Sequence, residues 1–226
     1  MTRFYQALSA FSAGCGKLPL CVGILLLLTA RLVPNMADVP TPAASASWTS
    51  SLPADFRIID EVLARRAPDL GFALRSQLAL SISEEARLAN YDPLLILALI
   101  DVESDFIEEA VSEKGARGLM QIRPSTLYFL ATQSGLRLTR EEVASDPSLQ
   151  VRMGIRYLRQ LQDRFGSLDL ALMAYNAGPT RLRRAMRSGK LDPFQRYTEL
   201  VKRDFRRFRE GMGLGGDWML AQREVR

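Results

Sequence analysis

The stretch Leu94–Ile122, which reads LLILALIDVESDFIEEAVSEKGARGLMQI, decides the fold of this chain. Its first seven residues are all apolar, and Asp92 and Pro93 before them supply an N-cap and the residue type that suits the first helical position. The pattern therefore predicts a helix from Pro93 that is apolar on nearly every side. A helix of this kind is buried, so we expect the other elements to pack around it.

One carboxylate, that of Glu103, follows the apolar run by about one helical turn. Burial disfavours a charged carboxylate and raises its pKa, which is the property that a general acid needs near neutral pH. Glu103 is therefore the candidate catalytic acid. The alternative is an ordinary surface glutamate, which is the commoner situation for a single Glu in a helix.

A glycine-rich turn follows the predicted helix. Gly115 and Gly118 provide positions where the backbone adopts a positive φ or approaches a ligand closely. Leu119 and Met120 are expected to pack beneath this loop, and the side-chain amide of Gln121 offers both a donor and an acceptor to a ligand. The alternative for the same residues is a purely structural turn.

The rest of the chain predicts further helices and no strand, since no alternating apolar pattern of useful length occurs. Thr139 and Glu142 form the pattern of a capping box at the start of a short helix. The fold class is therefore all-α. The other helices are expected at residues 54–66, 70–89, 124–133, 147–165, 168–176 and 193–210.

Composition excludes several kinds of chemistry. The 226 residues include no histidine, and both cysteines, Cys15 and Cys21, precede the predicted helices. Serine-histidine and cysteine-histidine catalysis and the usual zinc motifs are therefore excluded, and we expect neither a metal nor an organic cofactor. The net charge of +5 and the isoelectric point of about 9.5 suit an anionic partner such as cell-wall polymer, a membrane surface or nucleic acid.

The chain divides by composition into an N-terminal segment, a linker and a folded part. The apolar run 18–30 follows Arg3 and Lys17 and is too short for an ordinary membrane span, so it predicts a secretory signal, with an uncleaved anchor as the alternative. Export to the periplasm or envelope is the consequence. The expected divisions are a signal peptide or inner-membrane anchor (1–37), a Pro/Ala/Ser linker (38–53), a catalytic domain (54–190) and a basic C-terminal helix with a tail (191–226).

Cationic residues accumulate after Thr180. In the helix predicted after Asp192, an apolar stripe that includes Tyr197 and Phe205 lies opposite the arginines. These arginines form either a solvated face or a contact surface for phosphate-bearing wall polymers or anionic lipid. The glycines after Gly211 predict a flexible tail.

Three separated motifs occur in a fixed order: Glu103-Ser104, then GLMQ at residues 118–121, then AYNAG at residues 174–178. A fourth pattern supports them, Asp146-Pro147 followed by GIRYL at residues 154–158. Together they resemble the catalytic domain of the soluble lytic transglycosylase family, over roughly residues 78–188. The resemblance implies a lysozyme-like, single catalytic domain.

The resemblance also implies roles for individual residues. Glu103 is the expected catalytic residue. Tyr197 and Val201 match a later family segment in which the Tyr reaches the active site, although Phe194 and Gln195 replace the family's Glu-Thr. For Asn176 a helix C-cap is an equal alternative. The expected substrate-binding residues are Ser104, Gly118, Leu119, Met120, Gln121, Tyr175, Asn176 and Tyr197, with Tyr175 orienting either an acetamido group or the catalytic carboxylate.

The implied reaction is the cleavage of peptidoglycan between N-acetylmuramic acid and N-acetylglucosamine. In this family one Glu acts as acid and then as base, and the muramic acid 6-hydroxyl forms a 1,6-anhydro product. Asp101 and Asp105 lie about 200° round the helix from Glu103, so neither is expected to face the same bond. Two alternatives remain, a lysozyme-type hydrolase with a second carboxylate and a weakly catalytic wall-binding module. Nucleic acid is not an expected partner.

Overall fold

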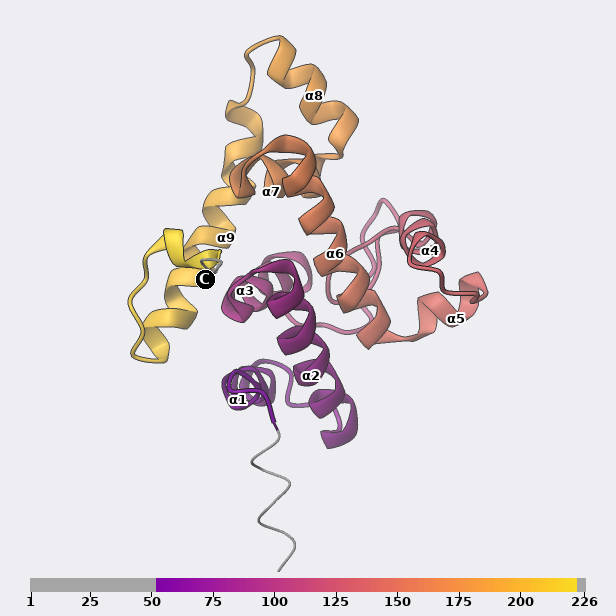
Figure 1. Cartoon of the computed structure of the whole chain (residues 1–226), viewed down its shortest axis with the longest axis vertical. Coiled ribbons are helices and arrows are strands. Elements are labelled where there is room, and N and C mark those ends of the chain that lie inside the picture. Colours follow the sequence, from indigo (N-terminus) through magenta and orange to yellow (C-terminus); the bar gives the residue numbers. More distant parts are fainter. Residues whose placement is uncertain (1–51, 223–226) are drawn as a thin grey trace, which may run out of the picture. The chain divides into compact units, whose positions relative to one another are not determined.

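Helix α3 (Pro93–Ser104) lies at the centre of the computed structural model, which describes residues 52–222 (Figure 1). Every residue from Pro93 to Ile100 is buried, as the sequence predicted. The carboxylate of Asp92 accepts a hydrogen bond of 2.8 Å from the Leu94 N–H and caps the helix. The helix ends at Asp105, where the backbone turns into the left-handed region with a φ of 52°.

Three helices cover α3. Helices α1 (Phe56–Arg66) and α2 (Phe72–Ala89) precede it in the chain, and α9 (Asp192–Gly211) returns to it from the C-terminal part (Figure 1). The apolar positions Leu78, Ile82 and Ala86 of α2 are buried in the shared core. The central helix is thus enclosed by segments from both ends of the described chain.

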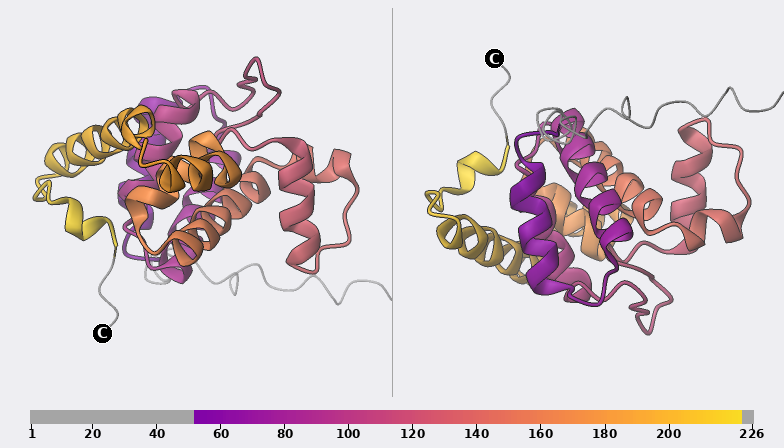
Figure 2. Two further views of the ribbon diagram at one scale, coloured as in Figure 1. Left: turned by 90° about the horizontal axis from the view of Figure 1, so that it is seen from above. Right: turned by 90° about the horizontal axis from the view of Figure 1, so that it is seen from below.

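The long helix α6 (Pro147–Phe165) is the centre of a second group of helices. It packs against α2 and against α7 (Leu168–Ala177), and it supports α4 (Pro124–Gln133) and the short α5 (Arg140–Ser145). The predicted capping box of Thr139 and Glu142 is present at the start of α5. Figure 2 shows α4 and α5 set to one side of the remaining helices.

Helix α8 (Pro179–Arg187) was missing from the sequence prediction. Only Leu182 and Ala185 of this helix are buried, and four arginines fill most of its other positions. Two buried side chains in nine residues give too weak an apolar period to identify a helix. The helix follows α7 directly through Gly178, and Figure 1 shows it at the end of the molecule remote from α1 and α2.

The prediction of a flexible tail after Gly211 was wrong for the residues up to Gln222. The 3-10 helix η3 (Trp218–Ala221) packs on α9, and the Trp218 ring meets the Phe205 ring edge-on at 5.6 Å. Ala221 is fully buried, and its carbonyl accepts a 3.0 Å hydrogen bond from the Asp92 N–H. The tail therefore holds the residue that begins the central helix.

Residues 52–190 and 191–222 belong to one compact unit, so α9 and η3 are parts of the domain rather than appendages. Regular structure in the described range is helical, with only isolated bridges between extended residues. No helix among residues 52–222 is both long and apolar enough to span a bilayer. The signal or anchor at 1–37 and nearly all of the linker at 38–53 fall outside the described residues.

Candidate active site

Glu103 occupies the last turn of α3, at the edge of the apolar core. Its side chain is partly exposed, and the surrounding burial raises the pKa of its carboxyl group from 4.5 to about 7. A hydrogen bond from the Tyr197 hydroxyl to Glu103 Oε1 acts in the opposite direction, because it stabilises the charged form. The pKa of Glu103 is thus set by two opposing effects, the burial of its carboxyl group and the hydrogen bond from Tyr197.

Tyr197 reaches Glu103 because α9 packs along α3. The Tyr197 side chain is buried on the same face of α9 as Val201 and Phe205. Burial and the nearby Glu103 carboxylate raise the pKa of the Tyr197 hydroxyl well above its ordinary value, so this group remains a donor. The altered residues before Tyr197, Phe194 and Gln195, have therefore not moved it away from the acid.

The GLMQ loop is braced by its own polar groups. Gly118 has a φ of 77°, and its N–H donates to the Ala110 carbonyl at 2.9 Å. The Gln121 amide nitrogen donates to the carbonyls of Ala110 and Gly118 at 3.0 and 2.9 Å. We expected Gln121 to offer a donor and an acceptor to a ligand, but the structure uses the donor within the loop. The amide oxygen of Gln121 accepts none of the hydrogen bonds that brace the loop.

Gly118 has a second reason to lack a side chain. A Cβ atom at this position would lie 1.9 Å from the Oε1 atom of Gln150, which is buried in α6. Gly154 plays a similar part under Met120, since a Cβ there would lie 2.5 Å from the Met120 sulfur. The loop therefore rests closely on α6 at two points.

Ser104 joins the acid-bearing helix to the loop. Its hydroxyl is buried and lies 2.9 Å from the Leu119 carbonyl oxygen and 3.1 Å from the Ile100 carbonyl oxygen. Leu119 and Met120 are each 1% exposed, so they pack beneath the loop as the sequence predicted. Ser104 consequently fixes the distance between the loop and the end of α3.

Tyr175 supports the same loop from α7. Its hydroxyl donates to the Met120 carbonyl at 2.8 Å, and its ring lies 5.6 Å from the ring of Tyr157. We predicted that this hydroxyl would orient an acetamido group or the catalytic carboxylate, whereas the structure directs it to the loop backbone. Asn176, the next residue, is exposed at the end of α7.

The two aspartates that flank Glu103 are bound by arginines. Asp101 pairs with Arg66 of α1 and Arg207 of α9, and Asp105 pairs with Arg66 as well. Burial raises the pKa of Asp101, and the two guanidinium groups oppose this shift. Neither arginine could be assigned to this region from the sequence, because each lies far from α3 in the chain. Both aspartates serve the packing of α1 and α9 around α3.

Comparison with known proteins places this arrangement in a family. Residues 81–197, which make up more than half of the chain, match the family described as the Transglycosylase SLT domain. The chain belongs to this family. The matched range of the SLT domain includes Glu103, the GLMQ loop, Tyr175 and Tyr197.

Named transglycosylases are among the relatives of this SLT chain. The transglycosylase of Enterobacteria phage PRD1 is 36% identical over 89 residues, which cover 39% of this chain and 30% of the phage protein. The endo-type membrane-bound lytic murein transglycosylase A of Klebsiella pneumoniae is 32% identical over 137 residues, 55% of this chain and 66% of that protein. The chain therefore spans less than two thirds of the length of either relative.

Solved structures share the fold. The 70 kDa soluble lytic transglycosylase SLT70 of Escherichia coli superimposes with a TM-score of 0.55 at 20% identity, over 76% of this chain and 32% of that protein. An inactive mutant of the lytic transglycosylase Slt of Pseudomonas aeruginosa superimposes with a TM-score of 0.52 at 24% identity, over 76% of this chain and 30% of that protein. These similarities confirm the predicted all-α, lysozyme-like SLT fold.

Proposed function

We propose that this protein is a peptidoglycan lytic transglycosylase that cleaves the bond between N-acetylmuramic acid and N-acetylglucosamine. The observation that carries the proposal is Glu103, whose pKa is raised to about 7 beside the GLMQ loop and the Tyr197 hydroxyl. A carboxyl group with this pKa is substantially protonated near neutral pH and loses its proton readily. Both properties are needed by a single group that acts as an acid and then as a base.

The proposed reaction proceeds in two proton transfers. Protonated Glu103 gives its proton to the glycosidic oxygen as the bond from that oxygen to the muramic acid C1 breaks. The Glu103 carboxylate then takes the proton of the muramic acid 6-hydroxyl, whose oxygen forms a new bond to C1. The products are a 1,6-anhydro end and a free hydroxyl on the leaving sugar, and no water is consumed.

The environment of Glu103 favours this single-carboxylate reaction over hydrolysis. Glycoside hydrolases ordinarily place a second carboxylate about 5 to 10 Å from the first. The nearest acidic residues along α3, Asp101 and Asp105, are bound to Arg66 and Arg207. Among the described residues no other carboxylate contributes to the raised pKa of Glu103. A lysozyme-type mechanism would need such a group.

The named relatives are consistent with the proposal. The Klebsiella pneumoniae protein is named a lytic murein transglycosylase, and the Pseudomonas aeruginosa structure is an inactive mutant in which a glutamine replaces a glutamate. We propose the corresponding dependence on one glutamate here, with Glu103 as that residue. Ser104, Gly118, Gln121 and Tyr175 keep the loop in position, while Asn176 and the Gln121 amide oxygen are left to contact sugar.

Mass spectrometry of the soluble products from purified peptidoglycan tests the reaction directly. The full chain is compared with its Glu103→Gln variant, which keeps the size of the side chain and cannot donate a proton in the same way. The expected result is muropeptides that are one water molecule lighter than reducing muropeptides, from the wild type alone. Reducing products would assign the protein as a hydrolase. Binding without any products would assign it as a wall-binding module.

We also propose that the protein is exported and works in the cell envelope, with 18–30 as the signal or anchor. Exposed arginines without an ion pair are denser on α8 than on α9, where Arg196 and Arg206 are the examples within the described residues. Lys202, Arg203, Arg207 and Arg209 of α9 are all paired with carboxylates. Within the described part of the chain, the α8 residues Arg183, Arg184 and Arg187 are exposed and form no ion pair.

Phosphate groups of anionic lipid are the proposed partner of this α8 surface, since each basic residue near such a membrane contributes about 1 kcal/mol. Co-sedimentation with phosphatidylglycerol vesicles is expected to fall about tenfold or more when Arg183, Arg184 and Arg187 are all changed to Gln. Phosphatidylcholine vesicles provide the control. Unchanged binding by the triple variant would assign the attraction to another part of the chain.

A further inference from the structure

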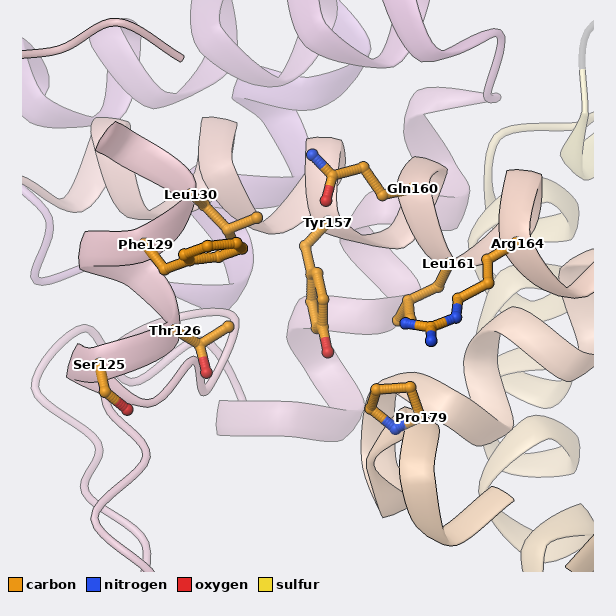
Figure 3. A pocket seen from close by; sticks show the side chains of 9 residues that line it. All are labelled: Ser125, Thr126, Phe129, Leu130, Tyr157, Gln160, Leu161, Arg164 and Pro179. Carbon is orange, nitrogen blue, oxygen red and sulfur yellow. The ribbon is translucent and has the colours of Figure 1, made fainter. Parts of the chain in front are cut away.

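A second candidate site lies beside the catalytic residues, in a cavity of about 520 Å³ between α4, α6 and the start of α8. Figure 3 shows Ser125, Thr126 and Phe129 on one wall, Tyr157 in the middle and Arg164 opposite. A cavity of this size accommodates a small organic ligand or a few residues of peptide. None of these side chains has a role in the reaction proposed above.

The cavity is connected to the active site through two aromatic rings. Tyr157 lines the cavity, and its ring contacts the ring of Tyr175 at a centroid distance of 5.6 Å. Tyr175 in turn holds the Met120 carbonyl of the GLMQ loop. Pro179, which also lines the cavity, directly follows the AYNAG motif. The Tyr157–Tyr175 contact therefore places the cavity next to the residue that holds the GLMQ loop.

The charge of the cavity is positive. Arg164 is the one charged residue that lines it, and no carboxylate is present in its walls. Within residues 52–222 the Arg164 guanidinium forms no ion pair, and it lies 5.9 Å from the centre of the Phe165 ring. An unpaired guanidinium over a cavity without acidic groups favours a planar anion such as a carboxylate.

Two helix N-termini add to this charge. The first turns of α4, with Ser125 and Thr126, and of α8, with Pro179, both line the cavity. Neither helix has a side chain that caps its first N–H groups. The N-terminus of a helix carries a positive partial charge, so both ends favour an anionic ligand. Pro179 has no N–H, so α8 contributes only this partial charge through the residue that lines the cavity. The guanidinium group and the two helix ends thus all favour a negatively charged ligand.

We propose that this cavity binds the peptide stem of a peptidoglycan strand, with Arg164 pairing with a carboxylate of the stem. The proposal rests on the proposed function. The N-acetylated sugars are neutral apart from the muramic acid carboxyl, which is consumed in the amide link to the stem, so the carboxylates of an intact strand belong to the peptide. The exposed Phe129 ring and the Tyr157 ring provide apolar contacts for the alanyl methyl groups.

Activity on two substrates tests the proposal. The full chain, Arg164→Gln and Arg164→Lys are each assayed on peptidoglycan with its stems and on glycan strands from which an amidase has removed them. Arg164→Gln is expected to lower kcat/KM about tenfold on stem-bearing strands and to leave the bare strands unaffected. Arg164→Lys is expected to recover part of the loss. The control is Arg57→Gln, an exposed change in α1 that should alter neither activity.

Equal losses on both substrates would show that the cavity binds glycan, and no loss on either would show that it binds neither part of the strand. Both outcomes would overturn the proposal. An inactive wild type would instead count against the proposed function, and a binding measurement separates the two cases. The full chain with Glu103→Gln is titrated with the tripeptide L-alanyl-γ-D-glutamyl-diaminopimelic acid in a calorimeter. Adding Arg164→Gln should weaken binding about tenfold, and unchanged binding would contradict the proposal.

Discussion

The hydroxyl group of Tyr197 in α9 donates a hydrogen bond to Oε1 of Glu103 at the end of α3, across 94 positions of sequence. This bond is made most strongly to the charged form of the carboxylate, so it lowers the pKa of Glu103 while burial raises it. The value of about 7 is the result of both effects. Each of them can be changed separately by mutation.

Replacing Tyr197 with Phe removes the donor and leaves the ring. The pKa of Glu103 should rise further, so the loss of activity with increasing pH should move to higher pH. The value of kcat should fall about tenfold, since a hydrogen bond to a charged group contributes about 1.5 kcal/mol or more. The pH profile of kcat/KM measures the shift.

The matched control for Tyr197→Phe is Tyr175→Phe. The hydroxyl of Tyr175 donates to the Met120 carbonyl and makes no contribution to the pKa of Glu103. This variant should lower the rate by loosening the loop and leave the position of the pH profile unchanged. A shift of equal size in both variants would contradict the separate roles assigned to the two tyrosines.

The raised pKa of Glu103 also predicts a dependence of stability on pH. Its folded pKa of about 7 exceeds the ordinary value of 4.5, so the stability contributed by the protonated carboxyl is complete below 4.5 and is lost as pH rises through about 7. Glu103→Gln has no charge to desolvate. At about pH 8 it should be more stable than the wild type by about 2 kcal/mol, and at about pH 4 the difference should be small.

Urea unfolding at the two pH values measures this difference. The control is Glu113→Gln, since the Glu113 side chain is exposed in the loop. It should change the free energy of unfolding by less than about 0.5 kcal/mol at either pH. A gain from Glu103→Gln that is equal at both pH values would show that the carboxylate is not desolvated.

Two glycines of the loop distinguish backbone strain from steric contact. Gly115 and Gly118 have φ angles of 74° and 77°, and only a Cβ at Gly118 would contact another residue, the buried Gln150. Gly115→Ala should destabilise the protein by about 1 kcal/mol through its backbone alone. Gly118→Ala should cost about 2 kcal/mol or more and should also reduce activity, because Gln150 must move. Equal effects in thermal unfolding and activity assays would contradict the role of this contact.

The packed C-terminal segment predicts that Trp218 stabilises the domain. Its ring meets Phe205, and its indole N–H donates to Asp169 at 3.1 Å. Trp218→Ala should lower the free energy of unfolding by about 2 to 3 kcal/mol. Met219→Ala is the control, since that side chain is 78% exposed and should contribute little. Similar unfolding midpoints for the two variants would show that η3 contributes little to stability.

The parts of the structure that were predictable from sequence depend on neighbouring residues. The apolar run, the Asp92 cap and the capping box at Thr139 lie within single helices, so their patterns identify α3 and α5 directly. Glu103 stood out because it follows an apolar helix by about one turn, whereas the flanking Asp101 and Asp105 were expected to face other directions. The resemblance to a family then placed it in order with the GLMQ and AYNAG motifs.

The parts that were missed depend on contacts between distant segments. No local pattern shows that Tyr175 binds the Met120 carbonyl or that the Gln121 donor is used within its own loop. The pairing of Asp101 with Arg66 and Arg207 likewise requires α1 and α9 to be in place. The C-terminal tail was misjudged because its glycines suggested flexibility, whereas Trp218 and Ala221 decide its position.

The path of the chain around α3 has a consequence for biosynthesis. Tyr197, which completes the surroundings of Glu103, lies in the last long helix, so it leaves the ribosome after every other part of the site. Until α9 docks, the acid-bearing end of α3 is open to water, and the carboxyl returns toward an ordinary acidity. A chain that ends before α9 therefore carries the ES, GLMQ and AYNAG motifs without the donor that acts on Glu103, and we expect it to cut peptidoglycan more slowly than the full chain.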